Sequence, residues 1–216
     1  MKTSTSILSS FLAVVVAFVI GIYFYPHLPQ LMATHWGLMG QVNGYMLKFW
    51  GTFMLPFIMF FAGALLYVIP ILDPMKDKAA HFQKEYNKFI VFFVLFLLYV
   101  YVLTVYANLG YAFNMIQFLM PALAILWFMI GELLPKVKRN WFIGIRTPWT
   151  RADEAVWDKT HVFGGFIFQL SAFVILIGAF FPASSFWFIL IPLIVSVLGP
   201  VFYSYALHRK MKMAKK

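Results

Sequence analysis

The chain has 216 residues, of which 63% are hydrophobic and only 11% are charged. A soluble globular domain is about half apolar and about a quarter charged, so this composition indicates a chain that is surrounded mostly by lipid. The high apolar content excludes an intrinsically disordered chain. Because the sequence contains no cysteine, it also excludes a disulfide framework, a cysteine zinc site and a thiol nucleophile.

Apolar stretches long enough to cross a bilayer recur along the whole chain. A membrane-spanning helix takes about 20 residues, and main-chain polar groups in lipid must be satisfied within the segment. Helix is therefore predicted even where Val, Ile and Phe are abundant. The first stretch lacks the small-residue cleavage pattern of a signal peptide and is interpreted as a retained span. The six predicted spans are residues 7–25, 49–72, 89–109, 113–134, 162–181 and 186–207.

The basic residues predict how these spans are oriented. In the six-span plan, every Lys and Arg except Lys48 falls on the side that holds both termini. By the positive-inside rule, that side is predicted to be cytoplasmic. The formal net charge of +10 is thus interpreted as a topology signal, and direct binding of nucleic acid is not expected. The predicted fold is all-α: a single six-span domain, residues 1–216, in the cell membrane with both termini cytoplasmic.

Few polar residues interrupt the predicted spans. None of the spans contains Asp, Lys or Arg, and Glu132 sits only at the end of the fourth, which argues against an ion-coupled pump. The amides and hydroxyls are expected to make interhelical hydrogen bonds. Prolines in three spans predict kinks or a cavity, and a small-molecule transporter or permease-like protein stays open as an alternative function. The polar residues are Thr104, Asn108, Asn114, Gln117, Gln169 and Ser196.

The predicted second loop opens with Asp73-Pro74, a pattern typical of a helix start. From Met75 to Phe89, apolar residues recur at steps of four and three. This spacing predicts an amphipathic helix that runs on into the third span.

The first external loop, residues 26–48, is long and nearly uncharged. Its glycines, including Gly40, predict tight turns, and Trp36 and Tyr45 fit an interfacial aromatic belt. Although His35 is a potential metal ligand, this side of the chain offers no Asp, Glu or Cys to complete a coordination shell, so no metal is expected. The composition is compatible both with a docking surface for an external apolar ligand and with a plain structural loop.

The predicted cytoplasmic loop 135–161 is the segment richest in motifs. The spacing of Thr150 and Asp153 resembles a capping box, which predicts a helix from about Arg151 toward the fifth span. Arg146, between turn residues, is expected to pair with one of the following carboxylates, Asp153, Glu154 or Asp158. Threonines and His161 do not form a nucleophile motif, so neither an enzyme nor a cofactor is predicted.

Two stretches of this loop resemble a known family. They read Asn140-Trp-Phe-Ile-Gly-Ile-Arg-Thr-Pro-Trp-Thr150 and Trp157-Asp-Lys-Thr-His-Val-Phe-Gly-Gly165, and they are similar to the SdpI family of bacterial multi-pass membrane proteins. The first external loop resembles the N-terminal domain of unknown function of that family. The residues that carry this second resemblance are Pro29, Thr34, His35, Trp36, Gly40, Gly44, Tyr45 and Lys48.

The resemblance implies a membrane immunity protein that protects its cell from an external peptide toxin. It also implies signalling, in which a transcriptional repressor is held at the membrane. The expected partners are therefore the lipid bilayer, a secreted toxin outside and a repressor inside. Residues 1–72 would form the N-terminal part and residues 73–216 the SdpI-like part. The implied toxin-binding residues are His35, Trp36, Gly40, Tyr45 and Lys48, and the implied cytoplasmic motif comprises Asn140, Gly144, Arg146, Thr147, Pro148, Trp149, Thr150, Trp157 and His161.

Overall fold

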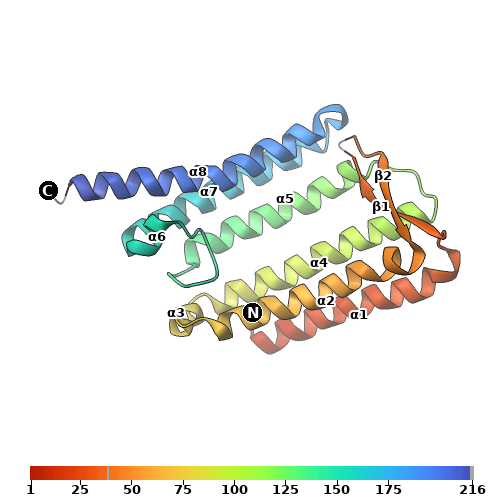
Figure 1. Ribbon diagram of the computed structural model, residues 1–216, viewed down its shortest axis with the longest axis horizontal. Coiled ribbons are helices and arrows are strands. Elements are labelled where there is room, and N and C mark those ends of the chain that lie inside the picture. Colours follow the sequence, from red (N-terminus) through yellow and green to blue (C-terminus); the bar gives the residue numbers. More distant parts are fainter. Residues whose placement is uncertain (38, 215–216) are drawn as a thin grey trace.

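Long helices run side by side through the whole molecule (Figure 1). The computed structural model describes residues 1–37 and 39–214. Within these residues, six helices are long and apolar enough to cross a membrane, which confirms the predicted all-α, six-span architecture. They are α1 (Thr3–Phe24), α2 (Lys48–Leu72), α4 (Gln83–Asn108), α5 (Met115–Leu133), α7 (Glu154–Gly178) and α8 (Ser185–Met213).

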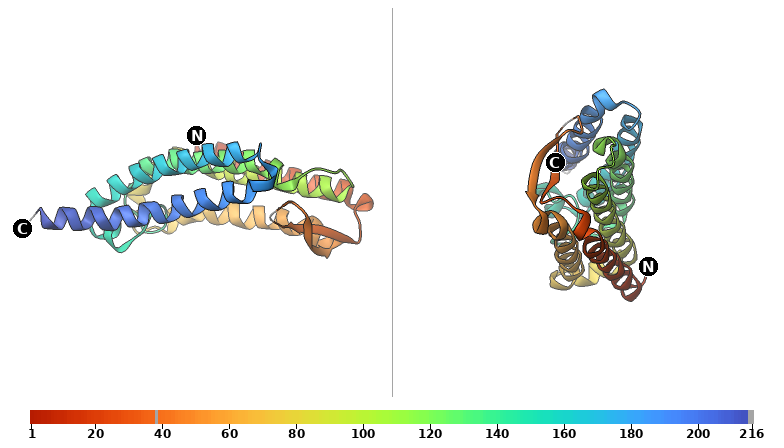
Figure 2. Two further views of the ribbon diagram at one scale, coloured as in Figure 1. Left: turned by 90° about the horizontal axis from the view of Figure 1, so that it is seen from above. Right: turned by 90° about the vertical axis from the view of Figure 1, so that its right-hand side faces the viewer.

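The six helices pack as two groups of three. Helices α1, α2 and α4 contact one another, α7 packs between α5 and α8, and the contact of α4 with α5 joins the groups. The resulting bundle is long and gently curved (Figure 2). Between α5 and α7 the backbones come close at Gly131 and Gly165, where a Cβ on either glycine would lie 2.8 Å from the carbonyl oxygen of the other. Small residues at such a crossing allow membrane helices to gain van der Waals contact.

The surface of the bundle is apolar and its interior holds several polar side chains. Large side chains such as Phe61, Phe166 and Phe202 are exposed on the spans, as expected for helices whose solvent is lipid. The prediction of interhelical hydrogen bonds is confirmed for three polar residues. Gln169 of α7 donates to Glu132 at 2.6 Å, Trp127 of α5 donates to Ser196 at 3.2 Å, and Gln117 of α5 donates to the carbonyl of Ala179 at 3.1 Å.

The two ends of the bundle differ sharply in charge. One end, called here the basic end, carries the start of α1, the connections α2–α4 and α5–α7, and the end of α8 (Figure 1). The other end carries residues 25–37 and 39–47 and the connections α4–α5 and α7–α8, and is called the hairpin end. Among the residues that the structure describes, Lys48 is the one Lys or Arg at the hairpin end. That the basic end faces the cytoplasm stays a prediction.

The first loop forms a β-hairpin, which the sequence analysis did not predict. After a short 3-10 turn η1 (Tyr25–His27), strand β1 (Leu31–Trp36) pairs antiparallel with β2 (Val42–Leu47). The predicted tight turn is confirmed at its tip. Gly40 has φ +83°, and its N–H donates to the carbonyl of Gly37 at 2.9 Å. The register shifts at His35, a bulge of the kind that turns a side chain toward a new direction.

The predicted continuous amphipathic helix before the third span is wrong. A short helix α3 (Lys76–Ala80) is followed by a turn at His81 and Phe82, and α4 begins only at Gln83. Phe82 is 1% exposed and belongs to the main apolar core. The buried ring of Phe82 therefore lies at the turn between the two helices.

The connection between α5 and α7 is folded more tightly than predicted. It contains a 3-10 turn η2 (Leu134–Lys136) and a short helix α6 (Pro148–Ala152), and a third 3-10 turn η3 (Pro182–Ser184) precedes α8. The predicted cap at Thr150 is wrong, because the N-cap of α6 is Thr147, whose side chain accepts from the N–H of Thr150. Asp153 instead begins α7, where its side chain accepts from the N–H groups of Ala155 and Val156.

Candidate functional site

The hairpin is fastened to the bundle by the side chain of Asn108, at the end of α4. Its Oδ1 accepts from the N–H of Ala33 at 2.7 Å, and its Nδ2 donates to the carbonyl of Ala33 at 2.9 Å. One carboxamide thus satisfies both main-chain groups of a buried residue of β1. The hairpin tip lies against α5, since a Cβ on Gly40 would lie 2.6 Å from Oδ1 of Asn114.

The underside of the hairpin encloses a cavity of about 320 Å³. Its floor is mostly apolar and comes from α2, α4 and α5, whereas His35 and Trp36 reach it from β1. Because most of the lining is apolar and the rest offers an imidazole, an indole and the hydroxyls of Thr34 and Thr104, the cavity suits an apolar group that needs a few directed polar contacts. The lining residues are Thr34, His35, Trp36, Gly51, Met54, Leu55, Val100, Thr104, Met115, Ile116 and Leu119.

The five residues proposed from the first loop do not share one place. His35 and Trp36 lie together at the cavity, and Nδ1 of His35 is 2.6 Å from Oδ1 of Asn43 across the hairpin. Tyr45 lies on β2 and is 62% exposed. Lys48 begins α2, and its Nζ lies 4.7 Å from the ring centroid of Tyr25. Gly40 belongs to the hairpin tip, which packs against Asn114 at the start of α5.

At the basic end, Asn140 shapes the first turn of the motif. Its Nδ2 donates to the carbonyls of Lys138 and Ile143, and its Oδ1 accepts from the N–H groups of Phe142 and Ile143. Asn140 is only 3% exposed. A buried side chain with four main-chain partners fixes the backbone of the turn rather than presenting itself to a ligand.

His161 and Trp157 form the buried centre of the motif. Their rings stack with centroids 4.2 Å apart, and Nε1 of Trp157 donates to the carbonyl of Val137 at 2.8 Å. Nδ1 of His161 donates to the carbonyl of Trp157 at 2.8 Å, while Nε2 accepts from the N–H of Ile145 at 3.0 Å. This pair of contacts requires a neutral imidazole that carries its proton on Nδ1.

The remaining motif residues tie the segment to α8. Thr147 contacts Oγ of Ser204 at 3.0 Å, and the side chain of Thr150 donates to the carbonyl of Ile145 at 2.9 Å. The ring of Trp149, which follows Pro148 at the start of α6, packs on Tyr205 at 5.0 Å between centroids. Through Thr147 and Trp149, the connection between α5 and α7 packs against α8.

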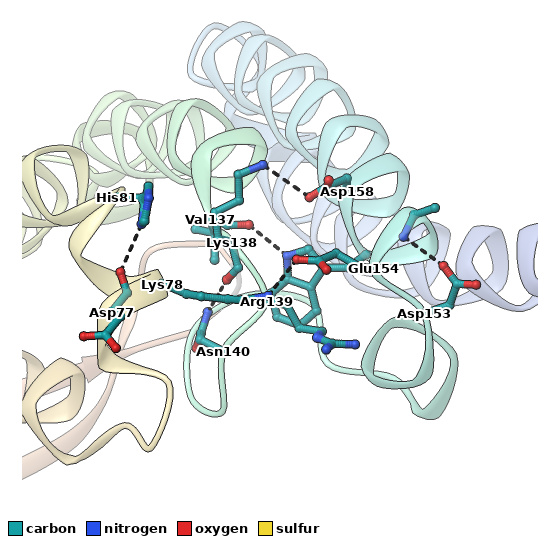
Figure 3. Close-up of polar contacts among 12 residues, drawn as sticks. Asp77, Lys78, His81, Val137, Lys138, Arg139, Asn140, Asp153, Glu154 and Asp158 are labelled. Atoms are coloured by element: carbon teal, nitrogen blue, oxygen red, sulfur yellow. Dashed lines mark hydrogen bonds and ion pairs between the residues drawn. The ribbon is translucent and has the colours of Figure 1, made fainter.

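The charged groups of this segment pair differently from the prediction. Glu154 binds Lys78 at 2.7 Å and Asp158 binds Lys138 at 3.7 Å (Figure 3). Arg146 was expected to bind one of these carboxylates, but its guanidinium donates to the main-chain carbonyl of Trp141. Glu154 and Asp158, both on α7, thus pair with a lysine of α3 and with a lysine that follows η2.

Several important residues were not recognised as site residues from the sequence. For Asp73 the sequence predicts only a helix cap, yet its Oδ2 also accepts from the N–H of Trp141 at 2.9 Å. Asn108 was read as one of several intramembrane amides, and nothing in the sequence reveals that its partner is β1. Apart from Thr104, the residues of the spans that line the cavity are apolar or glycine, and nothing in the sequence distinguishes them from lipid-facing neighbours.

Two segments of the chain match known protein families. Residues 136–204 match the SdpI/YfhL protein family, and residues 12–60 match a domain of unknown function, DUF1648. The chain is 26% identical over 189 residues to Immunity protein SdpI of Bacillus subtilis (strain 168), which covers 88% of each protein. No solved structure matches the chain. The family segment, the hairpin segment and a relative that spans both thus agree that the chain is similar to the SdpI family, and with its six apolar helices it is a multi-pass protein of the cell membrane.

Proposed function

We propose that this protein is a non-enzymatic membrane immunity protein that protects its cell from an external peptide toxin. The observation that carries the proposal is the alignment with Immunity protein SdpI, which extends over 88% of the chain and therefore includes both the hairpin and the basic-end motif. The cavity under the hairpin supports it, because it offers an apolar binding site at the end of the bundle opposite the predicted cytoplasmic charges.

In this proposal the hairpin end receives the toxin. An apolar side chain of the peptide enters the cavity between Trp36 and the floor formed by α2, α4 and α5, and polar groups of the peptide meet the rim at His35. Full burial of a large apolar side chain is worth about 1.5–3 kcal/mol. The near absence of charge at this end suits a peptide that approaches through the membrane surface.

The basic end would then report that the toxin is bound by holding a repressor protein. Helix α2 connects the two ends: a Cβ on Gly51 at its start would lie 2.7 Å from Met32 of the hairpin, and Asp73 at its end binds Trp141. In this proposal, a displacement of the hairpin against the start of α2 is transmitted along α2 and through the Asp73–Trp141 contact to the motif at the basic end.

A toxin-protection assay with matched tryptophan variants tests the proposal. Trp36→Ala removes the cavity wall and is expected to lower survival under toxin challenge at unchanged membrane abundance. Trp187→Ala is the control, because Trp187 lies at the same end on α8 and is 57% exposed. Equal protection by both variants would remove the cavity from the proposal, and no loss of protection on deletion of the gene would reject the immunity function itself.

A further inference from the structure

Two arginines at the basic end converge on one tryptophan. Arg146 donates to the carbonyl oxygen of Trp141, and the guanidinium carbon of Arg151 lies 4.6 Å from the centroid of the Trp141 ring. Both arginine side chains are exposed. A guanidinium has five N–H donors in a planar fork, so these contacts hold the two side chains in place while further donors are left for a ligand.

The two arginines border an open cleft of about 600 Å³. Its lining contains both cations and no carboxylate. The cleft therefore favours an anion, and its planar donors match the oxygens of a phosphate group. The lining residues are Arg146, Thr147, Pro148, Arg151 and Ala152.

The cleft is organised before any ligand binds. Asp73 is 3% exposed, and its two carboxylate oxygens accept from the N–H groups of Met75 at 2.7 Å and Trp141 at 2.9 Å. A buried carboxylate at the end of α2 thus fixes the residue on which both arginines rest. Preorganised donors lose less conformational freedom on binding, which favours affinity.

We propose that this cleft binds the phosphate of an anionic phospholipid headgroup, such as that of phosphatidylglycerol. A lipid is favoured over a soluble anion by the surroundings, because Trp141 and Phe142 are 48% and 43% exposed beside the arginines at the end of the bundle. Exposed aromatic rings at helix ends lie at the membrane interface, and basic pockets there take anionic headgroups. The inference holds whether or not the basic end also contacts a repressor.

Lipid titrations of the purified full-length chain test this site. The chain in mild detergent is titrated with short-chain phosphatidylglycerol, with short-chain phosphatidylcholine and with inorganic phosphate, and binding is measured by calorimetry. The variant Arg146→Gln/Arg151→Gln is compared with Arg209→Gln/Lys210→Gln, which removes the same charge from the exposed end of α8. The cleft variant is expected to bind phosphatidylglycerol roughly 25-fold more weakly, and the control within about twofold of the wild type.

A third variant tests the geometry without removing charge. Arg151→Lys keeps the cation but loses the planar fork that stacks on Trp141, and is expected to fold like the wild type and to weaken phosphatidylglycerol binding by about fivefold. It also serves as the readout if the double variant fails to fold.

Four outcomes would overturn the proposal. Equal weakening by the cleft and control variants would show attraction by net charge alone. Equal affinity for phosphatidylcholine would show that the cleft does not select an anionic headgroup. Inorganic phosphate that binds as tightly as the lipid, with the same dependence on the arginines, would assign the cleft to a soluble anion. Displacement of the lipid by an equimolar acidic peptide would show that the cleft binds a protein partner instead.

Discussion

Gly144 shows how a single residue fixes the basic-end motif. Its φ is +108°, and a Cβ at this position would lie 2.4 Å from Nε2 of His161. Gly144→Ala therefore combines backbone strain with a clash against the histidine that accepts from Ile145. Strain of this kind costs about 1–3 kcal/mol on its own. We expect a clear fall in the thermal unfolding temperature of the detergent-solubilised protein.

Gly110 provides the matched control for this substitution. It has φ +93°, but nothing lies within 4 Å of its Cβ position. Gly110→Ala therefore carries the strain without the clash. If both variants lowered the unfolding temperature equally, the contact of Gly144 with His161 would have no role in stability.

A second residue-scale prediction concerns the hydrogen bonds of His161. His161→Phe keeps a ring against Trp157 but removes the acceptor of the Ile145 N–H and the donor to the Trp157 carbonyl. A buried polar group left unpaired costs about 1–3 kcal/mol. We expect the unfolding temperature to fall, whereas His81→Phe, at an exposed histidine, should leave it nearly unchanged. If neither variant changed the unfolding temperature, the hydrogen bonds of His161 would contribute nothing to stability and only the packing of its ring would matter.

Sequence reasoning at this scale succeeded where a residue acts on its near neighbours. The turn at Gly40 was predicted because glycine permits a positive φ. The partner of Arg146 was predicted wrongly because nearness along the chain was taken as nearness in space. The partner of Asn108 was out of reach for the same reason, since Ala33 lies on a different element.

At the scale of elements, the hairpin is the part whose attachment can be tested. Asn108→Leu removes both hydrogen bonds to Ala33, and we expect the amides of residues 31–47 to exchange with solvent deuterium several-fold faster while the bundle stays folded. Gln117→Leu is the control, because it removes a hydrogen bond to Ala179 at the same end without touching the hairpin. Unchanged exchange in Asn108→Leu would contradict the anchoring role.

The spans were predictable as elements because lipid imposes length and apolarity on any helix that crosses it. The hairpin was not, because its strands are short and the burial of β1 does not alternate: both Met32 and Ala33 are buried. The start of α6 was misplaced because two threonines three residues apart each resemble a cap, and only their contacts show that Thr147 is the cap.

At the scale of the whole molecule, the separation of charge predicts the orientation in the membrane. A reporter domain fused after Gly40 is expected to be active only outside the cell, and the same reporter fused to the C-terminus only inside, because basic residues are retained on the cytoplasmic side. The same location for both reporters would contradict the six-span topology, and exchanged locations would contradict the predicted orientation.

The central claim is that this molecule protects its cell at the hairpin end. The most direct measurement is the survival of a strain that lacks the gene during co-culture with its parent, which the proposed function predicts to secrete the toxin. We expect the deletion strain to be killed, the intact chain and Trp187→Ala to restore survival, and Trp36→Ala to restore it only in part. Full survival of the deletion strain would contradict the account.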